Sequence, residues 1–138
     1  MKDLYSYMYE AKTSPKLPKL PKLKSGRYNA GNARINVETG MVTITAPGYV
    51  SLETYTFKMK PKDFITLIQA VKDGNTFEQD FKMIGKSRDW DYLSIDIDPR
   101  FNIIIMKNHP KNWNWSYQQS NISLSGFKDT IDEMVETI

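Results

Sequence analysis

The sequence predicts an α+β domain made of two β-β-β-β-α units in tandem, with antiparallel sheets and two amphipathic helices. The first observation is a pair of segments, residues 33–45 and 93–105, that align without a gap. In each segment an alternating apolar run stops at two or three turn residues and then resumes, which is the pattern of a β-hairpin. The second observation is that each hairpin precedes another extended run and then a stretch with helical spacing. We therefore expect one domain over residues 27–138, with repeats at 27–74 and 75–138.

In the first unit, the alternation of apolar residues marks the strands. The expected strands are residues 27–30, 33–37, 41–46 and 49–59. Pro61 fits the first position of a helix. The helical face that follows consists of Phe64, Leu67, Ile68 and Val71, and Gly74 is the expected stop.

The second unit repeats this order. The expected strands are residues 77–83, 90–97, 101–107 and 112–124, with a turn at residues 108–110. Ser125 is the expected N-cap of the last helix. Its apolar stripe consists of Phe127, Ile131, Met134, Val135 and Ile138.

Residues 1–26 are expected to form an extended basic arm outside the domain, because Lys-Leu-Pro recurs every third residue and proline blocks a helix. Residues 1–27 carry seven Lys or Arg against two acids, a net charge of +5. The whole chain has +3, so residues 28–138 carry −2, which argues against a wide duplex-DNA surface on the domain. In the arm, Lys16, Lys19 and Lys22 are candidates for phosphate contacts. The alternative is a solvated, semi-rigid linker.

Composition excludes several classes of function. The 138 residues hold 40% hydrophobic residues, and no apolar run approaches the roughly 20 residues of a membrane span. No cysteine and no secretory leader are present, so we expect a cytoplasmic protein, in the host cytoplasm if phage-encoded. With His109 as the single histidine, a Ser-His-Asp triad and a structural zinc site are not expected.

We therefore expect neither an enzyme nor a cofactor. The remaining enzyme hypothesis is a nuclease-like Mg²⁺ site at Asp96 and Asp98, whose carboxylates alternate on a strand. Alternating acids on a strand are more often its solvated face.

Aromatic and amide residues are densest over residues 112–119. Counting back from Ile122, the rings of Trp113, Trp115 and Tyr117 are expected on the sheet face away from the helix. Exposed rings stack nucleobases, at roughly 1–3 kcal/mol per base. The alternative is that these rings pack between two sheets. The further candidates for base or phosphate contacts are Tyr28, Arg34, Tyr55, Lys58 and Lys60 in the first unit, and Trp90, Tyr92 and Lys107 in the second.

The C-terminal segment, FNIIIMKN followed by a polar aromatic stretch and NISLSGFKDTIDEMVETI, carries a resemblance. It resembles the superfamily of single-stranded-DNA-binding proteins that includes the Whirly family and the transcriptional positive cofactor four. The resemblance covers residues 27–138, although the Whirly signature lysine-glycine-lysine-alanine-alanine-leucine is absent. It implies a Whirly-like fold, sequence-tolerant binding of single strands, and a homo-oligomer assembled through helix faces.

Two functions remain open. The first is a single-stranded DNA or RNA-binding protein, with DNA expected, in phage or mobile-element replication, recombination or transcription. The second is a small phage protein that docks on a host protein and inhibits or redirects it. The acidic face of the last helix favours the second function, because it suits a basic protein partner.

Overall fold

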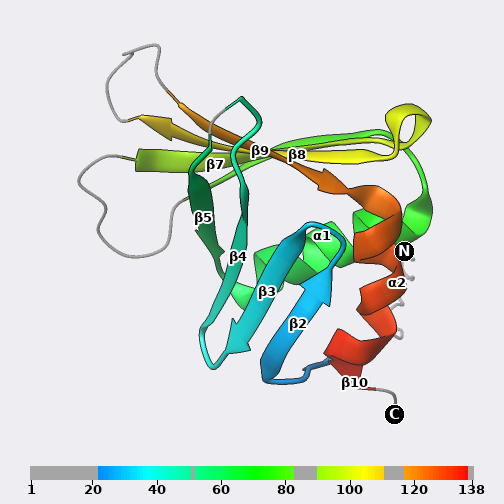
Figure 1. Cartoon of the computed structure of the whole chain (residues 1–138). Coiled ribbons are helices and arrows are strands. Elements are labelled where there is room, and N and C mark those ends of the chain that lie inside the picture. Colours follow the sequence, from blue (N-terminus) through cyan, green and yellow to red (C-terminus); the bar gives the residue numbers. More distant parts are fainter. Residues whose placement is uncertain (1–21, 51, 83–89, 111–116, 137–138) are drawn as a thin grey trace, which may run out of the picture.

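Two four-stranded antiparallel sheets and two helices form the body of the molecule. The computed structural model describes residues 22–50, 52–82, 90–110 and 117–136, and within them the architecture is α+β. Figure 1 shows one sheet across the top of the view, the other running down in front of one helix, and the second helix along one side. In both sheets each strand pairs with the next one in the chain, and a helix follows each sheet.

The first sheet consists of β2 (Gly26–Ala30), β3 (Ala33–Glu38), β4 (Met41–Pro47) and β5 (Thr54–Met59), and α1 (Pro61–Asp73) follows it. The second sheet consists of β6 (Phe77–Lys82), β7 (Trp90–Asp98), β8 (Ile103–Pro110) and β9 (Gln118–Ser123). A short 3-10 turn, η1 (Pro99–Phe101), joins β7 to β8, and α2 (Leu124–Met134) follows β9. The two-residue strands β1 (Lys22–Leu23) and β10 (Val135–Glu136) pair with each other.

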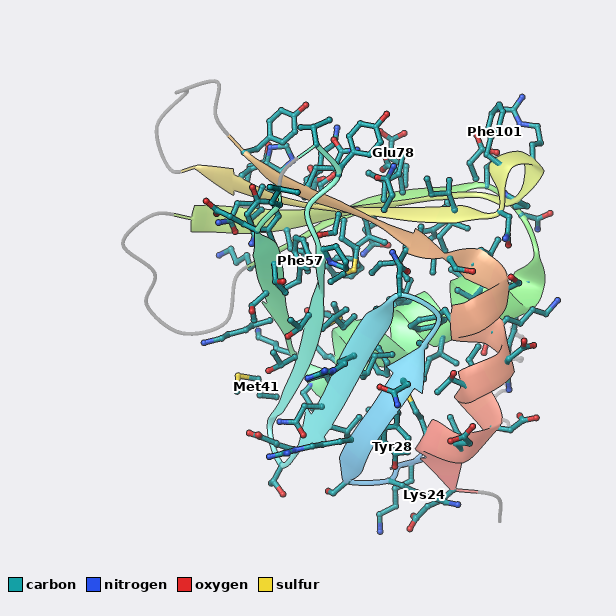
Figure 2. The ribbon with its side chains drawn as sticks, in the orientation of Figure 1. Lys24, Tyr28, Met41, Phe57, Glu78 and Phe101 are labelled. Carbon is teal, nitrogen blue, oxygen red and sulfur yellow. The ribbon has the colours of Figure 1, made fainter. Side chains whose placement is uncertain are left out.

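The inner faces of both sheets share one hydrophobic core with the helices. The residues matched in the sequence face the same way: Ile35 and Ile95 are buried, and so are Ile44 and Ile104. Because every second side chain of a strand lies on the same face, these buried positions determine which side chains of both hairpins face the core. Figure 2 shows Phe57, which is fully buried, below the second sheet.

The first helix is as predicted. Pro61 is its first residue, where a missing N–H costs nothing. Gly74 ends it in the left-handed conformation at φ 74° and donates its N–H to the Val71 carbonyl oxygen. The predicted apolar face of Phe64, Leu67, Ile68 and Val71 is buried.

The predicted N-cap of the second helix, Ser125, is wrong. The cap is Ser123, whose hydroxyl oxygen accepts from the Gly126 N–H at 3.1 Å. Ser125 instead lies in the first turn and donates its N–H to the Asn102 side-chain oxygen at 2.8 Å. Asn102 lies in the turn after η1, so this long-range bond, invisible in the sequence, starts the helix two residues earlier.

The apolar stripe of α2 is shorter than predicted. Phe127, Ile131 and Met134 are buried, whereas Val135 leaves the helix and pairs in β10 with Leu23 of β1. Ile138 lies outside the described residues. The Lys24 N–H also bonds to the Met134 carbonyl oxygen at 2.8 Å. Lys22, Leu23 and Lys24, which the sequence assigns to the basic arm or its border, therefore bond to the C-terminal end of the fold.

Three predicted strand limits are also wrong. The extended run expected over residues 49–59 is a strand only from Thr54. The second hairpin turn continues to Asn102 at φ 54°, which leaves Phe101 72% exposed instead of in the strand. The turn expected at residues 108–110 belongs to β8. There Asn108 is buried, and its side-chain nitrogen donates to the Thr56 carbonyl oxygen and the Gln118 side-chain oxygen, both at 3.0 Å.

The turn between β2 and β3 links the two sheets. The Asn32 amide donates to the Asn121 carbonyl oxygen at 2.7 Å, and its oxygen accepts from the Ser123 N–H at 3.1 Å. Gly126 and Gly31 pass so closely that a Cβ on Gly126 would lie 2.7 Å from the Gly31 Cα. Side chains there would separate the first hairpin from the start of α2.

Candidate nucleic-acid interface

The outer face of the first sheet is polar and cationic. Register places Arg27 beside Asn36, Asn36 beside Thr43, and Thr43 beside Lys58, so these four residues form one row across the strands. The next row contains Asn29, Arg34, Thr45 and Thr56. Arg27, Arg34 and Lys58 are exposed. The face thus offers guanidinium, ammonium, amide and hydroxyl groups, all of which bind phosphate or sugar oxygens.

Two hollows lie on this face. The larger one, about 480 Å³, is lined by Arg27, Tyr28, Asn29, Arg34, Ile35, Asn36, Thr43 and Thr45. The smaller one, about 270 Å³, is lined by Asn32, Arg34, Thr45, Ala46, Pro47 and Thr54. Arg34 and Thr45 line both hollows, so the depression continues from β2 along β4 toward the β4–β5 loop.

The cations of this face have no carboxylate partner within the part of the chain that the structure describes. The one acid on the face there, Glu38, accepts a hydrogen bond from the Asn36 amide at 2.6 Å. Three cations against one carboxylate leave a formal excess of two positive charges. Because these charges are solvent-exposed and unpaired, they are free to attract a polyanion.

The outer face of the second sheet carries a row of rings instead. Tyr92 of β7 stacks on His109 of β8, with ring centroids 4.4 Å apart and planes 9° from parallel. His109 in turn lies 6.0 Å from the ring of Tyr117, just before β9. The Lys107 ammonium sits 5.0 Å from the Tyr117 ring centroid, within the range of a cation–π interaction. Tyr117 is 49% exposed, so this ring row, as we call Tyr92, His109 and Tyr117, is open at one end.

The environment of His109 favours its neutral form. Burial lowers the pKa of His109 below its ordinary value, and the charge of Lys107 acts in the same direction. Asp80 and Asp96 oppose this shift by favouring the imidazolium. At neutral pH the middle of the ring row is therefore an uncharged imidazole, suited to stacking.

Four carboxylates accompany the rings on the same face, at Glu78, Asp80, Asp96 and Asp98. Asp98 is bound by Arg100, which donates from Nε and from Nη2, both at 3.1 Å, and this hydrogen bonding lowers the pKa of Asp98. Asp96 has one buried side-chain oxygen without a hydrogen-bond partner. Among the residues with described positions, no three acid or histidine side chains gather as a metal site would require.

The β4–β5 loop connects the two faces. The Tyr49 N–H donates to the Gln119 carbonyl oxygen at 2.7 Å, and Gln119 is the register partner of Lys107. Tyr49, Val50 and Leu52 are highly exposed, at 60%, 90% and 107%. In Figure 1 this loop rises past β9. The loop thus brings the Tyr49 backbone to β9, two residues along the chain from Tyr117.

The structure separates the predicted site residues into groups. Arg34 and Lys58 lie on the cationic face, and exposed Lys60 directly follows β5. Tyr92, Lys107 and Tyr117 come together at the ring row. The predicted outward position of Tyr117 is confirmed. Residues Lys16, Lys19, Trp113 and Trp115, and the Trp90 side chain, lie outside the described part.

The candidates Tyr28 and Tyr55 alternate with the outward residues of their strands, although Tyr28 also lines the larger hollow beside Arg34. Both tyrosines lie on the inner face, half-buried against the core. Tyr28 pairs in register with buried Ile35, and its hydroxyl donates to the Lys24 carbonyl oxygen at 2.8 Å. Lys22 lies in β1, with its ammonium 3.9 Å from the Glu136 carboxylate.

Two residues of the site, Arg27 and His109, are not among those predicted from the sequence. The sequence pattern marks Arg27 only as the start of a strand, although its parity with Asn29 places it on the outer face. His109 was read as a turn residue because Pro110 follows it. Counting alternate positions from Ile105 through Lys107 would have placed its ring on the outer face.

No protein-family model, curated protein or solved structure matches this chain. Neither described helix has the length and apolar character to cross a membrane.

Proposed function

We propose that this protein is a non-enzymatic, sequence-tolerant binder of single-stranded nucleic acid, with DNA as the expected ligand. The observation that carries the proposal is the ring row, three rings in sequence on an outer face with Lys107 beside the exposed one. A base of any identity presents a flat face that can stack on Tyr117. Stacking platforms beside cations are the usual means of binding single strands without reading sequence.

The cationic face of the first sheet supplies the phosphate contacts in this proposal. Arg34 lines both hollows, and these lead along β4 to the loop that bonds to β9. A strand can therefore place phosphates near Arg27 and Arg34, cross the β4–β5 loop, and stack its bases on the ring row. The arm lysines Lys16 and Lys19, and Lys22, would extend the phosphate contacts.

The acids of the second sheet support single strands over a duplex. Glu78, Asp80 and Asp96 would repel a phosphate backbone laid across that sheet. A single strand avoids this repulsion because its bases, turned toward the rings, keep the phosphates away. The charges thus favour base contact on one sheet and phosphate contact on the other.

A Whirly-like architecture and contacts through the helix faces are part of the same proposal. The order of four strands and a helix, used twice, supports two Whirly-like units in tandem. The exposed acids of α2, Asp129, Asp132 and Glu133, support helix-face contacts with other proteins or copies. A role in phage or mobile-element replication, recombination or transcription fits a small single-strand binder of this kind.

The test is fluorescence anisotropy with labelled oligo-dT, oligo-U and a duplex of equal length, at several salt concentrations. We expect oligo-dT to bind more tightly than the duplex, with an affinity that falls as salt rises. Tyr117→Ala should weaken oligo-dT binding, whereas the exposed cation change Lys128→Gln on α2 should not. If Tyr117→Ala bound oligo-dT as tightly as the unmodified protein, the ring row would not be part of the binding site.

One observation favours the second function, docking on a host protein. The exposed Tyr49, Val50 and Leu52 form an apolar tip that nucleic acid does not require. A pull-down after nuclease treatment separates the two functions. A partner retained by the unmodified protein and lost with Leu52→Asp would favour docking, and loss of all partners on nuclease treatment would favour nucleic acid.

A further inference from the structure

Three of the four outer edges of the large sheets form hydrogen bonds to other parts of the fold. On β2, the Thr130 hydroxyl of α2 donates to the Asn29 carbonyl oxygen at 2.8 Å. On β5, the Asn108 amide donates to the Thr56 carbonyl oxygen at 3.0 Å. On β9, the β2–β3 turn and the β4–β5 loop bond to the backbone of Gln119, Asn121 and Ser123.

The fourth edge, on β6, is open. Within the described residues, β6 pairs with β7 alone, and no hydrogen bond reaches its other side. An edge strand directs alternate N–H and C=O groups away from its sheet. Because β6 extends over Phe77–Lys82, the length of an ordinary strand, its free edge is a template for the addition of another extended segment.

The inner side of β6 offers apolar surface to such a segment. Gln79 lies on the inner face, in register with fully buried Ile95, yet Gln79 itself is exposed. A groove of about 440 Å³ lies between the start of β6 and α1. Its apolar lining consists of Ile65, Ala70 and Phe77. The inward side chains of an added strand would lie over this groove, so small apolar residues suit those positions.

The outer side of β6 determines the charges that the segment must carry. Glu78, Asp80 and Lys82 alternate on this face and are exposed. Figure 2 shows Glu78 on the opposite side of the second sheet from Phe57. Asp96, the register partner of Glu78, adds a carboxylate beside it. Opposite charges on neighbouring strands stabilise the pairing, so the segment needs cations opposite Glu78 and Asp80 and an acid opposite Lys82.

A second copy of β6 does not meet this requirement. Residues directly opposite each other in an antiparallel pair lie on the same face of the sheet, which restricts the registers of a two-fold pair. The two registers that overlap most of β6 place Glu78 opposite the second copy's Asp80, or Asp80 opposite its own counterpart. Both set like charges against each other, so the edge suits a different chain.

We propose that the outer edge of β6 binds an extended basic segment of a partner protein, which pairs antiparallel to β6 as a fifth strand of the second sheet. The segment alternates small apolar residues, which face the groove beside α1, with two cations opposite Glu78 and Asp80 and an acid opposite Lys82. This edge is distinct from the ring row and from the cationic face, so the proposal does not depend on nucleic-acid binding.

A synthetic peptide with blocked ends, Val-Glu-Val-Lys-Val-Lys-Val, is the probe for this edge. Laid antiparallel to β6, it places its Glu opposite Lys82 and its two Lys opposite Asp80 and Glu78. At about ten times its Kd, measured by anisotropy, the peptide should slow hydrogen exchange of the β6 amides in the full chain by about tenfold. The β2 amides should not change. Unchanged β6 exchange in excess peptide would overturn the proposal, as would slowing confined to the first sheet.

A charge variant tests the proposed side-chain pairing. The double change Glu78→Gln and Asp80→Asn should weaken peptide binding by roughly 2- to 30-fold, because two pairs of opposite charge are lost. Glu38→Gln is the matched control, since it removes an exposed acid from the first sheet, and it should bind the peptide as the unmodified protein does. If the double variant also bound the peptide as tightly as the unmodified protein, the proposed charge pairing would be wrong.

Two N-methylated peptides test the backbone pairing. One carries the methyl groups on its Val residues, and the other carries them on its Glu and Lys residues. Alternate N–H groups of a strand face its neighbour and the others face away, so methylation of one set should abolish binding and methylation of the other should not. Binding of both peptides, or of neither, would contradict the addition of a strand to β6.

Discussion

The two large sheets are alike on their inner faces and opposite on their outer faces. Ile44 and Ile104 occupy equivalent buried positions, one in each sheet. Outside, among described residues, the first sheet presents three cations against Glu38, whereas the second presents four carboxylates against Lys82 and Lys107. Core packing constrains an inner face tightly, while an outer face is free to specialise. This contrast in charge is what motivates the proposal that each outer face has its own task.

The largest expected effects are losses of stability, and they test whether the inner faces of the two sheets contribute equally to one core. Ile44→Ala and Ile104→Ala each remove a fully buried side chain, so each should lower the free energy of unfolding by about 2–5 kcal/mol. Because both sheets share one core, urea denaturation should show one transition in both variants. Thr43→Ala, on the outer face, is the control and should change little. Two separate transitions would show that the sheets unfold independently.

The next largest effects concern the affinity for oligo-dT and distinguish the roles proposed for the two outer faces. Tyr117→Ala should weaken oligo-dT binding by about 1–3 kcal/mol, roughly 5- to 150-fold, with little change in salt dependence. Arg34→Gln should weaken binding at low salt and reduce the slope of log affinity against log salt by about 0.7. Anisotropy titrations from low to moderate salt measure both quantities. If Tyr117→Ala changed the slope of log affinity against log salt and Arg34→Gln did not, the assignment of bases to the second sheet and phosphates to the first would be wrong.

The smallest effect concerns His109 and pH. Its pKa is lowered in the folded state, chiefly by burial, so the unfolded chain binds the proton more readily. The stability that His109 contributes is thus present above its ordinary pKa of 6.5 and is lost as pH falls below that value. Between pH 7 and 5, the unmodified protein should lose more stability than His109→Gln. Parallel curves for the two proteins would contradict this assignment.

The sequence was sufficient wherever local rules decide the structure. Strand parity at Ile35 and Ile95, the helix start at Pro61 and the stop at Gly74 follow from alternation, fixed φ and the left-handed cap. Ser123 rather than Ser125 caps α2 because Asn102, distant in the chain, binds the Ser125 N–H. Such a tertiary bond leaves no mark in a single sequence.

Tyrosines are the candidate residues whose sheet face is hardest to predict from the sequence. Tyr55 lies two residues before buried Phe57 and therefore on the same, inner face of β5, opposite to Lys58. Strand alternation alone would have placed it inside. A tyrosine suits either location, because its ring is apolar and its hydroxyl is polar. Charged Arg34 carries no such ambiguity, and its outward position was predictable.

We propose above that bases stack on the ring row while the first sheet holds phosphates. The chain has one histidine, so the imidazole protons of His109 give isolated signals in an NMR spectrum. Titration with oligo-dT tests the claim directly, since a base stacked on Tyr117 or intercalated beside His109 adds a ring current. We expect a saturable shift of the His109 signals that tracks binding. Unshifted signals in a sample saturated with oligo-dT would contradict it.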